Sequence, residues 1–252
     1  MATDGATQRA ACGQRRVEGS TLCKDCEIRS RAFCAAFDDA ELTALEAVIE
    51  TISLNANSEV FFEGDTADYM YNVNAGTVKI FKSLQDGRRQ ILGFPVDGDL
   101  LGYPVGDSHT YSAETLTPVR LCRVSRARLR DLASGFPALE SKLLEIMADE
   151  LADSQAQMTV LGRKSAPERV ASFLIQLSDK SIAHGGTGAS LSLPMSRHDI
   201  ADFIGLTAET VSRVLTQLTR DGLIAIPQPY QVDLIRIEAL RDLAAAESLD
   251  LK

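Results

Sequence analysis

The sequence contains no long hydrophobic run and no excess of basic residues. No apolar segment approaches the roughly 20 residues that a membrane-spanning helix needs, and the N-terminal stretch MATDGATQRA lacks the apolar centre of a signal peptide. A net charge of −9 argues against indiscriminate nucleic-acid binding, because that activity needs clustered Lys and Arg to neutralise phosphates. We therefore expect a folded cytoplasmic protein that does not bind membranes, with any DNA-reading surface confined to one region.

Motifs of catalysis are also missing. The sequence offers no nucleotide-binding loop, no catalytic dyad and no cluster of substrate-positioning residues. The three histidines, His109, His184 and His198, have no partners at metal-ligand spacing. With 252 residues the chain is long enough for two domains, each with its own core. These observations predict a protein of at least two domains that is not an enzyme.

Residues 136–163 are expected to form one long helix. Pro137 suits its first turn and Gly162 its last. A helix of this length spans roughly 40 Å, which exceeds an ordinary surface helix of a small domain. The seam residues recur at alternating steps of three and four, the repeat of a two-helix coiled coil: Leu144, Met147, Leu151, Ser154, Met158 and Leu161. We expect two copies of the chain to pair through this seam. The alternative is an amphipathic helix packed on its own domain.

The seam has the features of a weak dimer. Ser154 interrupts it, and a parallel pair would bring the like charges of Asp149, Glu150 and Asp153 near their copies. A weak dimer can be made or broken by a few kcal/mol supplied elsewhere in the protein. The sequence therefore predicts a homodimer whose formation is regulated.

Three of the five cysteines, Cys23, Cys26 and Cys34, lie within twelve residues. Because the chain has no export signal, they point to metal or redox chemistry before disulfides. Thiolates separated by two residues can bind one centre, and a third can close it from the far side. Arg29 and Arg31 lie beside them and are expected to favour the thiolate form.

A fourth thiol is needed, and the chain offers two. Cys122 lies in the strand-like residues 119–124, and Cys12 lies eleven residues before Cys23. Alone, Cys122 would be a small buried hydrophobic residue and Cys12 a thiol of a disordered tail. Zinc and an iron–sulfur cluster both fit this pattern.

The middle of the chain changes from helical to strand periodicity. Residues 38–52 are expected to form an amphipathic helix with an acidic start. Short apolar runs then follow at 60–62, 71–73, 78–81 and 91–94, and glycine-containing turns separate them. Turns about every 8–12 residues indicate an antiparallel β-barrel or jelly roll. The fold class is therefore predicted as α+β.

These turns resemble those of the cyclic-nucleotide-binding β-roll, through the segments 61–65 (FFEGD), 73–79 (VNAGTVK), 86–88 (DGR) and 98–102 (GDLLG). In nucleotide-binding members of that superfamily a Glu follows the last glycine, and an Arg-Ser/Thr-Ala triplet holds the cyclic phosphate. Here Tyr103 follows Gly102, and the triplet reads Tyr111-Ser112-Ala113. A buried phosphate without a cation is poorly stabilised. We expect no cyclic nucleotide effector, so millimolar cyclic AMP or cyclic GMP should not raise the melting temperature.

A helix-turn-helix is predicted near the C-terminus. Residues 167–177 form an amphipathic helix and 181–190 a Gly-rich loop. Ser196 then caps a short helix that Gly205 ends, and Thr207 caps a second helix that Gly222 ends. Two strand-like pieces, at 223–226 and 232–235, would add a wing.

Three exposed residues lie on one face of the second helix: Glu209, Ser212 and Arg213. Glu can accept from cytosine N4, and Arg can bind guanine O6 and N7. The Glu-x-x-Ser-Arg pattern resembles the base-reading face of the FNR branch of the Crp/FNR regulators. That resemblance implies a TTGAT-type half-site, with Arg197, Thr207 and Thr210 at the places of phosphate contacts. A parallel dimer would present two such helices to a palindrome.

The order of these parts resembles FNR-type oxygen-responsive regulators over nearly the whole chain. The domains would be a cysteine-rich loop at 1–36, a β-roll at 37–135, a dimerisation helix at 136–163 and a winged helix-turn-helix at 164–252. The spacing of the cysteines is similar to that of alphaproteobacterial FNR-like proteins. This resemblance implies a [4Fe-4S] cluster on Cys23, Cys26, Cys34 and Cys122.

In the mechanism implied by the resemblance, the cluster biases the chain toward a DNA-binding dimer at low oxygen, and oxygen releases that bias. The dimer would then recruit RNA polymerase and activate transcription, with the turn around Asp86 similar in position to an activating surface of the family. Two alternatives stay open: a structural zinc site, or a thiol-redox regulator in which Cys12 and one neighbour form a disulfide.

Overall fold

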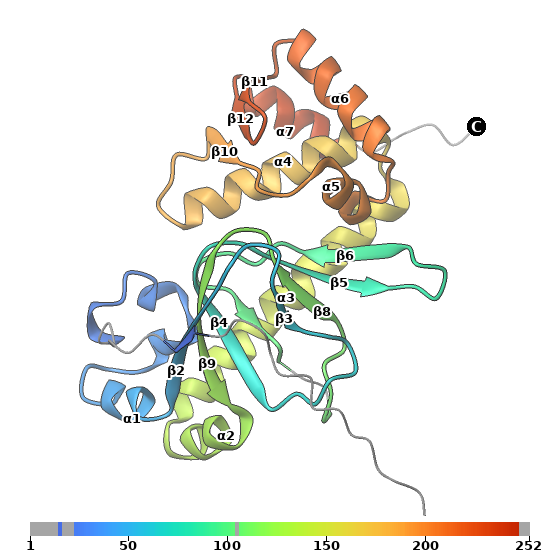
Figure 1. The fold of residues 1–252 in the computed structure, drawn as a ribbon. Coiled ribbons are helices and arrows are strands. Elements are labelled where there is room, and N and C mark those ends of the chain that lie inside the picture. The colour runs from blue at the N-terminus through green and yellow to red at the C-terminus, as the bar shows by residue number, and fades with distance from the viewer. Residues whose placement is uncertain (1–14, 17–22, 104–105, 247–252) are drawn as a thin grey trace, which may run out of the picture.

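The computed structural model describes residues 15–16, 23–103 and 106–246. It contains an N-terminal cysteine loop, a β-roll, one long helix and a helical C-terminal domain with a small sheet (Figure 1). The prediction of an α+β protein is confirmed. No helix among these residues is long and apolar enough to span a membrane.

The β-roll consists of two antiparallel sheets. One sheet has the order β1-β2-β9-β4-β7 and the other β3-β8-β5-β6. The bounds of the strands are β1 Arg15–Arg16, β2 Ile49–Leu54, β3 Glu59–Phe61, β4 Tyr69–Ala75, β5 Val78–Ser83, β6 Arg89–Gly93, β7 Leu100–Leu101, β8 Ser112–Thr115 and β9 Val119–Ser125. Alternate residues such as Ile52, Val73 and Leu121 are fully buried between the sheets. On each strand the residues next to these point to the outer side of the sheet. The cysteine loop packs against that outer side.

The helix expected over residues 38–52 is much shorter than predicted. The structure has only α1, Leu42–Glu46, and the chain is already in strand β2 from Ile49. Six residues of β2 pair with β9, from Ile49 opposite Val124 to Leu54 opposite Val119. The prediction was wrong because a strand partner about 70 residues away in the sequence satisfies this backbone, and β-branched residues suit the ladder.

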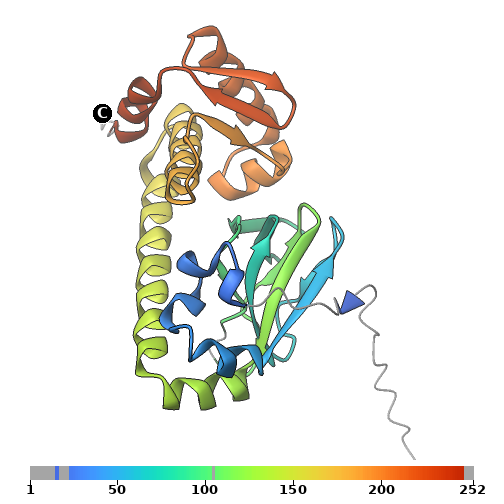
Figure 2. The ribbon, with the colours of Figure 1, turned by 90° about the vertical axis from the view of Figure 1, so that its left-hand side faces the viewer.

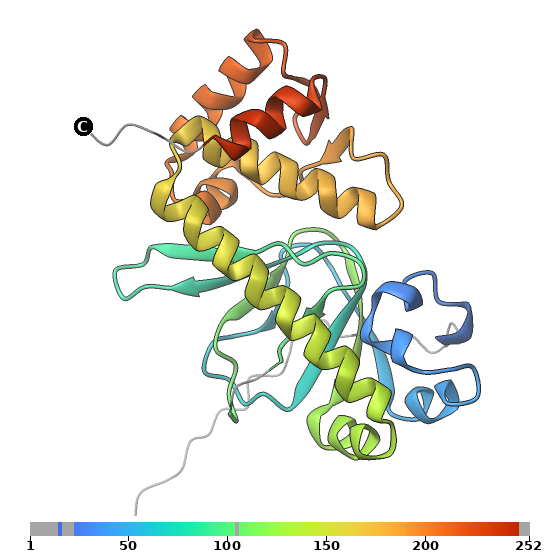
Figure 3. The same cartoon turned by 180° about the vertical axis from the view of Figure 1, so that it is seen from behind.

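The long helix matches its prediction closely. Helix α2, Arg126–Gly135, begins at the cap Ser125, and α3, Pro137–Arg163, begins with proline in its first turn. Near its N-terminal end α3 buries Leu139 and Leu143. Figure 3 shows α3 crossing the back of the β-roll and continuing to the C-terminal domain. The helix therefore contacts every other part of the molecule.

The C-terminal domain is a winged helix-turn-helix. Its helices are α4 Ala166–Ala183, α5 Arg197–Ile204, α6 Ala208–Arg220 and α7 Ile237–Ala245, and its strands are β10 Ser190–Ser192, β11 Ile224–Gln228 and β12 Gln231–Leu234. Ser196 and Thr207 cap α5 and α6, and Gly205 ends α5 in the left-handed region, as predicted. Strand β10 was not predicted, because its three residues carry no periodicity of their own. It pairs with β12 beside the wing.

The β-roll and the C-terminal domain meet at a few defined points. The buried Lys79 on β5 forms ion pairs with Glu114 at 2.9 Å and with Asp199 on α5 at 3.4 Å. The Gln90 side chain donates to the backbone carbonyl of Asp202 at 2.7 Å. Phe94 from the roll packs edge-on against Phe203, with ring centroids 5.3 Å apart. The first helix of the DNA-binding motif is therefore fixed to the β5–β6 hairpin.

Candidate cysteine site and DNA-reading surface

The cysteine loop folds into three short 3-10 turns, η1 Cys23–Asp25, η2 Arg29–Arg31 and η3 Phe33–Ala36. Figure 2 shows this loop between the roll and α3. The backbone N–H of Cys23 donates to Glu46 at 2.7 Å. Cys34 is buried in one hydrophobic cluster with Leu139 and Leu143 of α3. The cysteine loop is thus held directly beside α3.

Cys122 completes the group from strand β9. Its cross-strand neighbours are Thr51 on β2 and Asn72 on β4. Because Leu121 faces the core, Cys122 faces the outer side of the sheet, where the loop lies. All four cysteines of the described residues are free thiols gathered at this place. Cys12, the other candidate ligand, lies outside the described residues.

Burial makes these thiols hard to ionise. Burial is the main cause and neighbouring negative charge the second, and together they raise the pKa of Cys34 to about 12 and that of Cys23 to about 11. The charge comes from the other thiols for Cys34, and first from Glu46 for Cys23. The pKa of Cys122 is also raised, chiefly by burial. The expectation that Arg29 and Arg31 favour the thiolates was wrong. Arg29 pairs with Asp39 at 2.7 Å, and Arg31 donates to the His184 carbonyl at 2.9 Å.

The donor set consists of soft sulfur ligands, and in this structure the described side chains are not arranged around a single ion. A zinc ion needs sulfurs about 2.3 Å from one point, and no three Cys, His, Asp or Glu side chains of the described residues come together closely enough to hold one ion. The thiols are nevertheless near enough for their charges to interact. Beside Cys122, Oδ1 of Asn72 is buried without a hydrogen-bond partner among the described residues. The described residues thus bring four soft thiol donors to this place, the donor type that iron–sulfur clusters take.

The DNA-reading candidates lie on and around α6. Glu209, Ser212 and Arg213 are all exposed. Arg213 donates to the Thr210 hydroxyl at 3.2 Å, which lies 2.9 Å from the Thr207 hydroxyl. This chain of contacts holds the guanidinium near the start of the helix.

The three phosphate candidates have different surroundings. Thr207 is exposed, and its hydroxyl accepts the N–H of Thr210 as the helix cap. Thr210 and Arg197 are half-buried. Burial lowers the pKa of Arg197. Each side chain lies close to the exposed start of α5 or α6, the end of a helix that suits an anion.

Most of the predicted seam on α3 is solvent-exposed in this single chain. Leu144, Leu151 and Met158 have exposed fractions of 71%, 59% and 69%. Ser154 is exposed as well, whereas Met147 and Leu161 are half-buried. Figure 2 shows the side of α3 away from the roll free of the other described elements. Exposed large apolar side chains in a row are the expected appearance of an unpaired interface.

The position of the phosphate-binding arginine is filled by Tyr111. Its hydroxyl accepts the N–H of Gly102 at 2.9 Å, and its ring lies 5.6 Å from that of Phe61. His109 is buried and stacks on Phe61 with a 3.8 Å centroid distance. This end of the roll is therefore occupied by packed rings.

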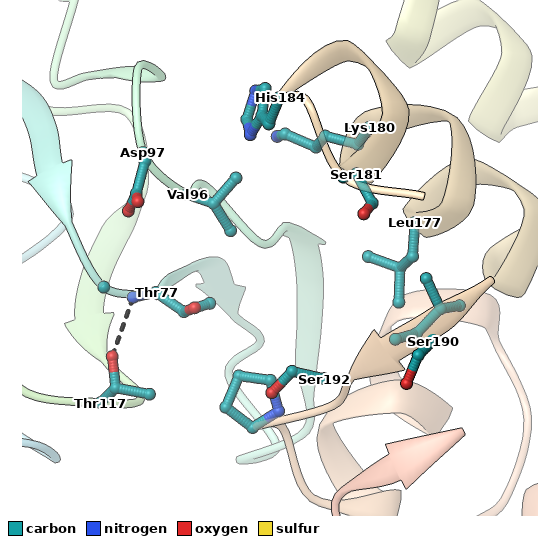
Figure 4. A pocket seen from close by; sticks show the side chains of 14 residues that line it. Thr77, Val96, Asp97, Thr117, Leu177, Lys180, Ser181, His184, Ser190 and Ser192 are labelled. Atoms are coloured by element: carbon teal, nitrogen blue, oxygen red, sulfur yellow. Dashed lines mark hydrogen bonds between the residues drawn. The ribbon is translucent and has the colours of Figure 1, made fainter. Parts of the chain in front are cut away.

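A cleft of about 460 Å³ separates the roll from α4 and β10 (Figure 4). Asp97 and Thr77 line one wall, and Lys180, Ser181 and His184 line the other. Lys180 also forms an ion pair with Asp99. Elsewhere the two domains share one hydrophobic cluster, to which the roll contributes Phe81, Ile91 and Phe94.

Two residues at the cysteine site were missed from the sequence, Asn74 and Arg120. Asn74 donates from Nδ2 to the Cys26 sulfur at 3.4 Å, and Arg120 donates to Asn74. Arg120 could have been found, because it lies two residues before Cys122 and so shares its face of the strand. Asn74 has no such signal, since only the pairing of β4 brings it there.

Two family models match the chain. Residues 51–135 match the cyclic nucleotide-binding domain, and residues 168–243 match the Crp-like helix-turn-helix domain. The chain is 40% identical over 221 residues to the nitrogen fixation regulation protein FixK of Bradyrhizobium diazoefficiens, covering 87% of this chain and 93% of that protein. It is 35% identical over 208 residues to the transcriptional activator protein FnrL of Cereibacter sphaeroides, covering 81% and 84%.

A solved structure agrees with these matches. FixK2 from Bradyrhizobium japonicum superimposes with a TM-score of 0.74 at 37% identity, covering 80% of this chain and 100% of that one. Fold, domain order and identity over most of the chain therefore agree with the predicted resemblance and with a protein that is not an enzyme. The chain belongs to the Crp/FNR family of DNA-binding transcription regulators, in its FNR-type branch.

Proposed function

We propose that this protein is an oxygen-responsive transcription activator in which Cys23, Cys26, Cys34 and Cys122 hold a [4Fe-4S] cluster. The observation that carries this proposal is the gathering of four free thiols from the loop and β9 beside α3. Thiolates are the usual protein ligands of such clusters. When bound, the cluster supplies oxygen-sensitive bonds that tie the loop to the sheet.

The packing supports a route from the thiols to the dimer seam. Cys34 and Phe33 on η3 pack with Leu139 and Leu143 on one face of α3, and the exposed Leu144 and Leu151 lie on another face of the same helix. A loop held in place stabilises the N-terminal half of α3 and presents its seam. A released loop removes that support, and a change of about 1.4 kcal/mol shifts the dimer equilibrium tenfold.

We propose that the dimer binds a TTGAT-type palindrome through two copies of α6. Glu209, Ser212 and Arg213 are assigned to bases, and Arg197, Thr207 and Thr210 to phosphates. The exposure of the base-reading set and the contact of Arg213 with Thr210 support this division. We propose the four domains at the boundaries expected from the sequence, and we assign the protein to the cytoplasm.

Replacing Arg213 with Ala should weaken binding to the palindrome roughly 5- to 150-fold, because a bidentate contact with guanine contributes about 1–3 kcal/mol. The measurement is a fluorescence titration of two DNAs, one intact and one with that G·C pair exchanged. The variant should no longer distinguish the two DNAs. Arg220→Ala, which removes an exposed charge from the last turn of α6, is the matched control and should keep the discrimination. An equal loss on both DNAs would assign Arg213 to phosphate instead.

The proposed partners are palindromic DNA, a second copy of the chain and RNA polymerase. Polymerase contact is assigned to the turn between β5 and β6, where Asp86 pairs with Arg88 at 2.8 Å. Replacing Asp86 should lower transcription and leave DNA binding intact.

We propose no cyclic nucleotide effector, because Tyr111 and the surrounding rings occupy the end of the roll where the phosphate would bind.

The composition of the centre tests the proposal directly. The protein is purified without oxygen and assayed for iron, zinc and acid-labile sulfide per chain while hydrodynamic mass is followed on admitting air. About four iron and four sulfide in a dimer that bleaches and dissociates would support the oxygen switch. One zinc in a colourless, air-indifferent protein would favour a structural zinc site, and a disulfide formed in air without metal would favour a thiol-redox regulator.

A further inference from the structure

A β-bulge in β4 directs Asn74 at the cysteine loop. On β4, Val73 pairs with Leu121 of β9 and Ala75 pairs with Arg120, so Asn74 is the extra residue of the bulge. Bulges re-aim side chains and occur beside functional sites. Here the half-buried Asn74 amide reaches the Cys26 sulfur at 3.4 Å.

Arg120 fixes which way the Asn74 amide points. Its Nε donates to Oδ1 of Asn74. Since a guanidinium has donors and no acceptor, the atom facing it must be the amide oxygen. The NH₂ group therefore faces Cys26. The flipped amide is excluded, because it would place its NH₂ donor against the guanidinium donor.

We propose that Asn74, oriented by Arg120, is a positioning residue that tunes the Cys26 ligand and thereby the oxygen sensitivity of the centre. The inference rests on the proposed [4Fe-4S] function. A hydrogen bond donated to a ligand sulfur stabilises negative charge there, which raises the reduction potential of an iron–sulfur centre and makes oxidation less favourable. Arg120 is exposed, so water screens its charge and its main effect is to orient the amide.

The experiment uses the full chain purified without oxygen. Asn74→Leu keeps a similar volume without a donor, Asn74→Asp keeps the partner of Arg120 but offers only acceptors, and Asn74→Gln retains a donor. The measured quantities are the rate of loss of visible absorption after a fixed dose of oxygen, the midpoint potential, and iron release to a chelator without oxygen. Arg120→Gln is compared with Arg130→Gln, which removes the same charge from an exposed site on α2.

Asn74→Leu and Asn74→Asp are expected to lose the centre about three- to tenfold faster in oxygen, as the loss of one hydrogen bond predicts, with lower midpoint potentials. Asn74→Gln should recover most of the wild-type rate, and Arg120→Gln should show a smaller change in the same direction than the Asn74 variants. Arg130→Gln should match the wild type. If Asn74→Leu does not fold, the Arg120→Gln comparison decides the outcome alone.

Two results would overturn the inference. One is that the donor-free variants have wild-type potentials and oxygen rates. The other is that all variants at Asn74, including Gln, release iron equally fast without oxygen, which would show a purely structural role. A wild-type protein without iron and sulfide would instead refute the proposed function, and this is measured before any variant is made.

Discussion

The Cys122→Ser protein is expected to purify without a full iron–sulfur centre, to remain mostly monomeric without oxygen, and to bind the palindrome roughly 5- to 150-fold more weakly than wild type. That range is the usual size of a coupling free energy between two sites. A serine hydroxyl is a poor replacement for a soft thiolate ligand. Among the described cysteines, Cys122 lies on strand β9 and the other three lie in the loop, so the variant loses the proposed ligand that connects the loop to β9.

Sedimentation velocity and DNA titration, both under anoxia, measure this effect. Cys12→Ser serves as the matched control, because it removes one thiol but no proposed ligand, and it should behave as wild type. If Cys122→Ser dimerises and binds DNA as well as the wild type under anoxia, the proposed link between the thiols and the seam is wrong.

The Ser154→Leu protein is expected to dimerise in air and to activate transcription there. Each leucine buried in the seam contributes about 1.5–3 kcal/mol, so two per dimer should raise association roughly a hundredfold or more. Ser154 is exposed in the single chain, and its hydroxyl already donates to the Glu150 carbonyl at 2.8 Å. Its replacement therefore removes a hydrogen bond within α3, and leucine is the better helix former.

Sedimentation equilibrium in air measures the dimer, and Gln155→Leu adds the same side chain one position away from the seam as the control. The double variant Cys122→Ser/Ser154→Leu should also dimerise, because the new seam supplies the free energy that the thiols no longer provide. If the Ser154→Leu protein stays monomeric in air but dimerises normally under anoxia, the assignment of Ser154 to the seam is wrong.

Several elements could be predicted because their signals are local. Pro137 begins α3, and Ser196, Gly205 and Thr207 limit the helices of the DNA-binding motif. Caps and breakers act through hydrogen bonds within a few residues, so they work in the same way in any fold. The spacing of the thiols and the repeat of the seam are likewise properties of the sequence alone.

Other features depended on residues far apart in the chain. Residues 49–52 have an acceptable helical pattern, but pairing with β9 makes them strand β2. Arg29 and Arg31 lie beside the thiols in sequence, yet the fold gives them Asp39 and His184 as partners, and burial raises the pKa of Cys34 to about 12.

The sequence by itself determined the order of the parts, the ends of the long helix, the DNA-binding motif and the identity of four candidate ligands. Only the tertiary structure decided that Cys122 meets the loop, that the loop packs on α3, and that a bulge turns Asn74 toward Cys26. The physical reason is range. Helix caps and periodicity are set by neighbours along the chain, whereas desolvation, strand register and the orientation of an amide are set by whichever distant residues the packing brings together.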